Sequence, residues 1–396
     1  MTPTADRPES DAVAVPWGSP TVRVVLLATL LAPLGVPLVS PALPVIREAL
    51  GLTDAQASLL VSAYFLTGIG LSPFIGLLTD RVGRRRVLVA SVFAFSLTGS
   101  AIAVGPGFAT VLAVRILQGT AAAGIFITTV TLVGDTFEGL QRNAVLGANT
   151  AVLSAGAALY PLLGGVLATV AWNAVFLAYL LGLPVGVVAY RLLPEPPGER
   201  GGRGPAYFGK VLSALSAGDA LRLYGAAFGL ELLLFGAVIT ALPFLLWETY
   251  GLSPVRIGLV ITAAEVSSAA VASQNGRVAR YLSEFRIVAL GFAAVGVGLV
   301  GLWSAPTVAL VGAAAAVVGA GWGLSLPSVD DATSDRVPAQ YRAGALSLRN
   351  SATFLGRAAG PVTFTTLAVG GGYRPLLLGA GLLALAGAGV LWLSSN

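Results

Sequence analysis

Residues 76–86 read Gly76-Leu-Leu-Thr-Asp80-Arg81-Val-Gly83-Arg84-Arg85-Arg86. Charged residues make up only 10% of the chain, and yet four arginines and an aspartate fall within seven positions here. Long apolar stretches come before and after this run. The pattern predicts a loop where the chain leaves a membrane, turns tightly and enters it again.

The composition of the whole chain supports that interpretation. Of its 396 residues 56% are hydrophobic, and the mean hydropathy is +0.85, which indicates a polytopic membrane protein. A spanning helix needs about 20 mostly apolar residues. Twelve stretches qualify, at roughly 21–45, 55–78, 87–105, 108–133, 143–168, 172–192, 221–247, 256–275, 286–304, 306–327, 343–369 and 374–393. We therefore expect an all-α protein.

The chain contains no cysteine and no histidine. This excludes disulfides, thiol chemistry and Cys/His metal sites, and we expect no metal and no cofactor. A proton carrier would have to be a carboxylate or a tyrosine. The basic residues are scattered over loops, so they do not indicate nucleic-acid binding. Residues 1–20 are polar and look like a cytoplasmic tail, not a signal peptide.

The arginines give the expected orientation. With the N-terminus in the cytoplasm, only Arg47, Arg256 and Arg374 fall on the outer side. Arg115 and Arg357 fall inside spans, and the remaining arginines and the single lysine lie on the cytoplasmic side. This bias places both termini in the cytoplasm and predicts a multi-pass protein of the plasma membrane.

The two halves of the chain repeat each other at a spacing of about 200 residues. The matching pairs are Gly51 and Gly251, Gly76 and Gly276, Arg86 and Arg286, Arg142 and Arg342, Gly156 and Gly356, and Pro161 and Pro361. We expect a tail at 1–20, a six-helix bundle at 21–192, a linker at 193–220 and a second bundle at 221–393. Twelve transmembrane helices thus form two pseudo-symmetric bundles of the same orientation, related by an axis along the membrane normal.

Three motifs carry a resemblance to the major facilitator superfamily over nearly the whole chain. The loop after the second span fits the pattern G-x-x-x-D-R-x-G-R-R/K with Gly76, Asp80, Arg81, Gly83, Arg84 and Arg85. The fourth span fits R-x-x-Q-G with Arg115, Gln118 and Gly119. The fifth span resembles the G-x-x-x-G-P-x-x-G-G pattern of drug/proton antiporters with Gly156, Pro161, Gly164 and Gly165, but Tyr160 replaces the middle glycine.

The resemblance implies where each helix lies and what it contributes. The first, fourth, seventh and tenth would line a central cavity, and the second, fifth, eighth and eleventh would join the bundles. Arg115 would take part in proton coupling. Asp80 would act as a conformational latch against the start of the eleventh helix, at residues 343–346, where a helix N-terminus attracts a carboxylate. The glycines of the fifth span would allow close helix packing.

Charges inside spans are expensive and are candidates for function. We predict Glu231 and Glu265 as proton or cation sites, because a carboxylate whose surroundings alternate can take up a proton on one side and release it on the other. The sequence leaves open whether Arg357 pairs with Glu265 as a structural ion pair. Glu248, at the outer end of the seventh span, is expected to be solvated. The predicted cavity residues are Gln118, Asn149, Tyr160, Trp322 and Arg357.

The function predicted from these features is secondary transport of a small molecule, and we expect proton-coupled efflux of small apolar or cationic compounds by a monomer in the lipid bilayer. A metabolite importer or facilitator of the same superfamily is the alternative, and a sensor or scaffold is the weakest. No nucleophile and base stand together, so we expect no enzyme. Residues 204–210 match the pattern G-x-x-x-x-G-K of phosphate-binding loops, but Val211 replaces the required Ser or Thr. We therefore interpret this stretch as linker and not as a nucleotide site.

Overall fold

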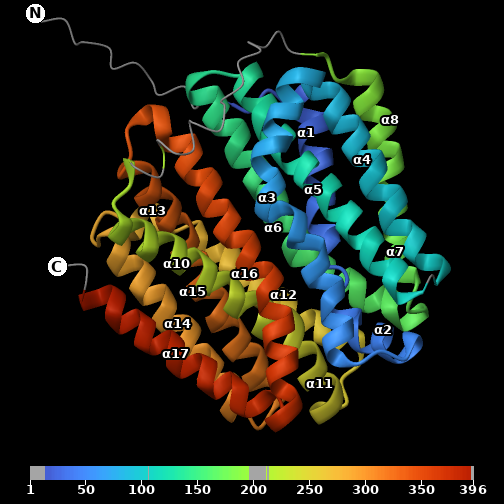
Figure 1. The fold of residues 1–396 in the computed structure, drawn as a ribbon, viewed down its shortest axis with the longest axis vertical. Coiled ribbons are helices and arrows are strands. Elements are labelled where there is room, and N and C mark those ends of the chain that lie inside the picture. Colours follow the sequence, from blue (N-terminus) through green and yellow to red (C-terminus); the bar gives the residue numbers. More distant parts are fainter. Residues whose placement is uncertain (1–13, 106, 196–210, 212–213, 394–396) are drawn as a thin grey trace, which may run out of the picture.

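The computed structural model of the chain describes residues 14–105, 107–195, 211 and 214–393, without the side chains of residues 72, 73, 76, 77, 80 and 217. Helices dominate these residues, and no strand occurs among them. Figure 1 shows two groups of helices side by side, α1 to α8 in blue to green and α10 to α17 in yellow to red. The prediction of an all-α membrane protein is confirmed.

The first group covers the six spans predicted for the first half. Its elements are α1 (Pro20–Leu31), η1 (Ala32–Gly35), η2 (Ser40–Ala42), α2 (Leu43–Leu50), α3 (Asp54–Val82), α4 (Arg84–Ala101), η3 (Ile102–Val104), α5 (Phe108–Thr136), α6 (Gly139–Val170), α7 (Ala174–Leu177), η4 (Ala178–Leu181) and α8 (Gly182–Leu192). The first span is broken between α1 and α2, where Pro33, Pro37 and Pro41 remove backbone donors.

The second group covers the other six spans. Its elements are α10 (Ala217–Leu233), the π-helix η5 (Leu234–Ala241), α11 (Leu242–Tyr250), α12 (Pro254–Ala272), α13 (Asn275–Val278), α14 (Glu284–Ser304), α15 (Val308–Asp335), η6 (Ala339–Tyr341), α16 (Arg342–Gly371) and α17 (Tyr373–Leu393). In the described part of the chain, ten helical segments are long and apolar enough to cross a membrane, and α3 and α16 complete the twelve predicted.

The repeated glycines end equivalent helices. Gly51 follows α2 with φ 62° and Gly251 follows α11 with φ 59°. Glycine adopts this left-handed conformation without a Cβ clash, so it stops a helix at this point. The bundle and linker boundaries stay predictions, because most of 193–220 and of 1–20 lies outside the described residues.

The halves meet along two helix pairs, α3 with α16 and α6 with α12. A Cβ on Gly165 would lie 2.4 Å from the Pro254 carbonyl oxygen, and one on Gly258 would lie 2.3 Å from that of Pro161. Only glycine allows backbones to approach so closely. These are the second, fifth, eighth and eleventh helices, which the family resemblance expects at this interface.

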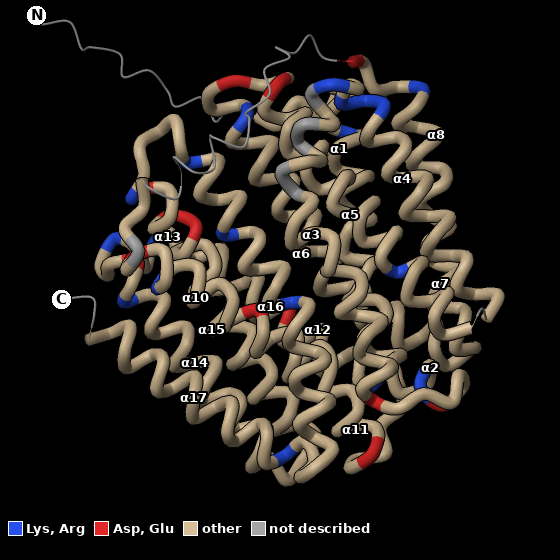
Figure 2. Tube along the Cα trace, in the orientation of Figure 1, with Lys and Arg blue, Asp and Glu red and all other residues tan. Residues whose placement is uncertain are grey.

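The charges separate the two ends of the molecule. Figure 2 shows Lys and Arg gathered mainly at one end, where α3 meets α4. We call this the arginine-rich end, and it also holds the connections from α5 to α6 and from α15 to α16. The opposite end holds the connections from α2 to α3, from α11 to α12 and from α16 to α17.

Candidate functional site

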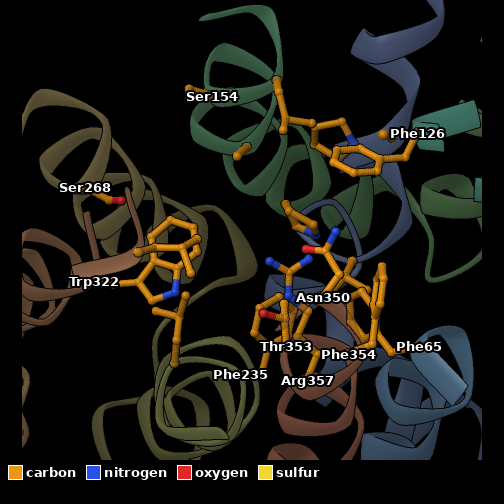
Figure 3. A pocket seen from close by; sticks show the side chains of 18 of the residues that line it. Phe65, Phe126, Ser154, Phe235, Ser268, Trp322, Asn350, Thr353, Phe354 and Arg357 are labelled. Carbon is orange, nitrogen blue, oxygen red and sulfur yellow. The ribbon is translucent and has the colours of Figure 1, made fainter. Parts of the chain in front are cut away.

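A cavity of about 540 Å³ lies between the two halves. Its lining comes from the broken first span, α3, α5, α6, η5, α12, α15 and α16. On α12, α15 and α16 the lining residues lie from mid-helix toward the arginine-rich end. Figure 3 shows Trp322 on one wall, with Phe65, Phe354 and Arg357 on the other. The cavity is large enough for a drug-sized molecule.

Arg357 on the cavity wall forms a bidentate ion pair with Glu231. Its Nε donates to one carboxylate oxygen at 3.0 Å and its Nη2 to the other at 2.9 Å. The Glu231 side chain is completely buried, while that of Arg357 is 24% exposed. The structure thus pairs Arg357 with Glu231 and not with Glu265, the partner that the sequence left open.

Helix packing explains this choice of partner. A Cβ on Gly356 would lie 2.5 Å from the Phe228 carbonyl oxygen, and one on Gly360 would lie 2.5 Å from that of Leu232. These two glycines bring α16 against α10 and η5, so the residue after Gly356 reaches Glu231. The sequence shows the glycines but not which helix they contact.

Glu265 and Trp322 provide polar groups on the cavity wall. Among the described residues, none donates a hydrogen bond to or forms an ion pair with the Glu265 carboxylate, which lies on α12. The Trp322 indole Nε1 is buried and has no acceptor within the described part of the chain. Both residues can therefore bind a partner that enters the cavity.

Arg115 and Gln118 lie behind the wall. Arg115 is completely buried and donates to the carbonyl oxygens of Leu60 at 2.8 Å and Gly35 at 2.7 Å. It also donates to Gln118 Oε1 at 2.8 Å. The carbonyl of Gly35 belongs to the break in the first span, so Arg115 satisfies a backbone group that the break exposes. The prediction of Gln118 as a cavity residue is wrong, because Gln118 is buried beside Arg115 and does not belong to the cavity lining.

Two other predicted cavity residues also face away from it. Asn149 accepts a hydrogen bond of 2.6 Å from Thr29, and Tyr160 donates one of 2.8 Å to the Leu30 carbonyl. Both tie α6 to α1, and neither belongs to the cavity lining. Tyr160 thus fills a helix contact where the family motif has glycine, and of the five predicted cavity residues Trp322 and Arg357 lie on the wall.

A second ion pair on the wall is absent from the sequence predictions. Arg349 on α16 pairs with Asp330 on α15, and both residues line the cavity. The sequence count placed Arg349 in a loop, but it lies two turns inside α16 and is only 7% exposed. The spacing of eight residues from Arg357 was the available signal, because i and i+8 share a helix face.

Polar contacts between the halves close the opposite end. The Arg47 Nη1 donates at 2.5 Å to both Asp54 in its own half and Glu248 in the other half. Tyr373 donates to Asp54 at 2.5 Å, and Trp247 donates to Glu48 at 2.8 Å. Glu248 is thus an ion-pair partner, and the expectation that it is merely solvated is wrong.

Replacing Arg47 with glutamine is expected to loosen this end, because hydrogen bonds to charged groups contribute about 1.5–3 kcal/mol each. The chain has no cysteine, so a cysteine at the buried Ala42 reports opening by its reaction with a maleimide. We expect labelling about tenfold faster in Arg47→Gln. Arg256→Gln, an exposed arginine at the same end, should label at the original rate, and equal rates in both variants would contradict the role of Arg47.

The predicted loop is reduced to Gly83 between α3 and α4, and the start of α4 is fixed from two sides. Arg84 is buried and its Nε donates to Asp135 on α5 at 2.8 Å. The backbone amides of Arg84 and Arg85 donate to the carboxylate of Glu195, at 2.6 and 3.2 Å. An anion at a helix start is favourable. Arg81 is exposed, and the side chain of Asp80 lies outside the described part of the chain.

Comparison with known proteins agrees with this arrangement. The profile of the Major Facilitator Superfamily matches residues 25–361 and, in a second match, 223–396. The class G tetracycline resistance protein of Vibrio anguillarum is 29% identical over 354 residues, covering 87% of this chain and 89% of that protein. The quinolone resistance protein NorA of Staphylococcus aureus is 31% identical over 164 residues, 41% of this chain and 42% of that protein.

Solved structures share the fold at lower identity. A bacterial homologue of the human lysosomal transporter Spinster, in an inward-facing and occupied conformation, superposes with a TM-score of 0.77 at 15% identity, covering 94% of this chain and 96% of that one. The human organic anion transporter MFSD10 superposes with a TM-score of 0.69 at 20% identity, covering 94% and 99%. With the family profile matched along most of its length, the chain belongs to the major facilitator superfamily, whose members are transporters and not enzymes.

Proposed function

We propose that this chain exports small apolar or cationic compounds in exchange for protons. One observation carries the proposal: a cavity closed at one end holds the Glu265 carboxylate, which has no ion-pair partner among the described residues, beside the buried pair of Glu231 and Arg357. Charges in the middle of a membrane are expensive and mark ion pathways. The names of the two resistance proteins support efflux as the direction.

The arginine distribution supports a location of the arginine-rich end and both termini in the cytoplasm. The proposed protein acts as a monomer in the plasma membrane. The cavity then faces the cytoplasm, and the Arg47 contacts seal the outer side. A cargo molecule enters from the cytoplasm and meets Glu265 and Trp322. Arg115 and Gln118 support the broken first span, while Glu231 and Glu265 carry the protons.

The proposed cycle needs the proton and the cargo to use the carboxylates in turn. On the cytoplasmic side, release of a proton from Glu265 to the cytoplasm leaves a charge that a cationic cargo neutralises. After the halves reorient, a proton from the outside neutralises the Glu265 carboxylate again, and the cargo leaves. A membrane potential of 100 mV supplies roughly 2.3 kcal/mol for each net charge that moves, so it helps when one proton exchanges for a neutral cargo or two protons for a singly charged one, whereas a one-for-one exchange with a cation runs on the pH difference alone. One or two protons a cycle are enough for modest export.

Purified protein in liposomes with an imposed pH gradient tests this function. A tetracycline and a quinolone serve as probes, and the internal pH is recorded. We expect cargo-dependent proton movement in the original protein and in Glu138→Gln, an exposed carboxylate, but none in Glu231→Gln. Movement of cargo with the proton in the same direction would identify an importer, and unchanged coupling in both Glu231→Gln and Glu265→Gln would exclude them as carriers.

We also propose Asp80 as a latch that holds the cytoplasmic side closed against the N-terminus of α16, an interaction of about 0.3–1 kcal/mol. Asp80→Asn is expected to slow the transport cycle while cargo affinity in detergent stays within about twofold. Transport rates in liposomes and equilibrium binding, measured on the same preparation, separate the two effects. A loss of affinity at an unchanged rate would rule out the latch.

A further inference from the structure

Three phenylalanine rings surround the charged end of Arg357. The guanidinium carbon lies 5.1 Å from the ring centroid of Phe235, 5.6 Å from that of Phe65 and 5.9 Å from that of Phe354. A cation within about 6 Å of a ring centroid is attracted by the negative ring face, and more strongly when water is excluded. The Glu231 carboxylate holds the two donors Nε and Nη2 of the same group.

Phe65 differs from the other two rings because it comes from the first half of the protein. It lies on α3, while Phe235 lies on η5 and Phe354 and Arg357 lie on α16. The ring of Phe65 packs edge-on against Phe235 at 5.1 Å and tilted against Phe354 at 6.2 Å. A Cβ on Gly68 would lie 2.8 Å from the Phe354 ring, so this approach of α3 to α16 requires glycine.

The neighbouring ring of Tyr64 connects the same helix to the buried Arg115. The Arg115 guanidinium carbon lies 4.9 Å from the Tyr64 ring centroid. Tyr64 and Phe65 pack edge to face, with centroids 5.1 Å apart and an interplanar angle of 88°. One turn of α3 therefore contacts an arginine inside the membrane from each half, Arg115 and Arg357.

We propose that Phe65 is a positioning residue for proton coupling, which holds the Arg357 guanidinium on Glu231 from across the interface of the halves. This inference rests on the proposed proton-coupled transport. When Glu231 takes up a proton, the bidentate pair loses its charge attraction and the rings alone hold Arg357. A movement of α3 relative to α16 then changes how well Glu231 competes for its proton. The ring thereby links helix movement to protonation.

The surroundings of the pair decide which variants test this. The other titratable groups that face it are Glu265 on α12, Tyr64 on α3 and Arg349 on α16, itself paired with Asp330. Phe65→Leu keeps an apolar side chain but removes the ring, while Phe65→Tyr keeps a ring. Phe126→Leu is the matched control, because Phe126 lines the same cavity and the described contacts of Arg357 do not include it.

Two measurements test the proposal. The first is a double-mutant cycle in thermal unfolding. Phe65→Leu combined with Arg357→Met should show a coupling equivalent to about a tenfold change in the equilibrium constant of unfolding. Phe126→Leu combined with Arg357→Met should show no coupling. In liposomes, Phe65→Leu should move the pH at half-maximal transport upward by about one unit, with Phe65→Tyr restoring it. The shift is upward because a weaker hold on Arg357 leaves the Glu231 carboxylate less stabilised.

The outcomes separate this inference from the proposed function. If the unfolding cycle shows no coupling between Phe65 and Arg357, the contact between them does not hold Arg357 in place. If it shows coupling but the pH profile of transport is unchanged, the ring of Phe65 only stabilises the fold, and its positioning role is excluded. If the original protein moves no protons with any cargo, the proposed function fails. The unfolding cycle still decides in that case whether Phe65 holds Arg357.

Discussion

Arg357→Met is expected to destabilise the protein by about 3–5 kcal/mol near neutral pH, because it leaves a buried carboxylate without its partner. Glu231 is completely buried and receives two hydrogen bonds from this arginine. The loss should become smaller at acidic pH, since a proton on Glu231 then removes the unpaired charge. Thermal unfolding of the purified protein in detergent, at several pH values, measures the effect.

The double variant Glu231→Gln with Arg357→Met is the control. It removes both charges, so it should recover most of the lost stability, because replacing a buried pair as a whole is often neutral. Arg277→Met, which removes an exposed arginine outside the cavity, should change stability little. Two results would show that Arg357 stabilises the fold through packing and not through Glu231. One is a loss of stability in the double variant equal to the sum of the two single losses, and the other is a loss in Arg357→Met that does not depend on pH.

Gly164→Ala is expected to be the most damaging small substitution in α6, with a loss of about 3 kcal/mol or more. Its Cβ would lie 1.8 Å from the carbonyl oxygen of Leu38, in the break of the first span. A backbone atom cannot move aside as a flexible side chain can, so α6 would have to separate from this segment. The fraction of protein that elutes as a folded monodisperse species from a size-exclusion column gives the first measure, and thermal unfolding gives the second.

Gly147→Ala provides the comparison within the same helix. A Cβ added to Gly147 would meet no atom within 4 Å, and alanine is favoured over glycine in a helix by about 1 kcal/mol. We therefore expect Gly147→Ala to be neutral or stabilising. Equal losses in the two variants would mean that α6 is sensitive to helix propensity and not to the contact at Leu38.

The site was predictable only in part. Intramembrane charge pointed to Glu231, Glu265 and Arg357, because few charged residues lie in apolar segments. It did not show that Arg357 meets Glu231, since that depends on the contact of α16 with α10 through Gly356. Phe65 carried no signal either, as one aromatic residue among 16 phenylalanines looks like core.

Motif residues were more informative about helix packing than about the cavity. Gly164 and Gly165 of the fifth-span motif do lie at close backbone contacts. In contrast, Gln118, Asn149 and Tyr160 are polar residues in apolar helices that satisfy other buried groups. A buried polar side chain must find some partner, and the sequence does not distinguish a partner in the protein from one in the cavity.

The sequence by itself determined the membrane class, the twelve spans, the internal repeat and the family, because apolar length, glycine positions and arginine bias are local features of the chain. The tertiary structure decided the partners: Arg357 with Glu231, Arg349 with Asp330 and Arg47 with Glu248. Each pair joins residues of different helices, and which faces meet depends on backbone approach and side-chain packing across the whole molecule. Periodicity along one helix cannot provide that information.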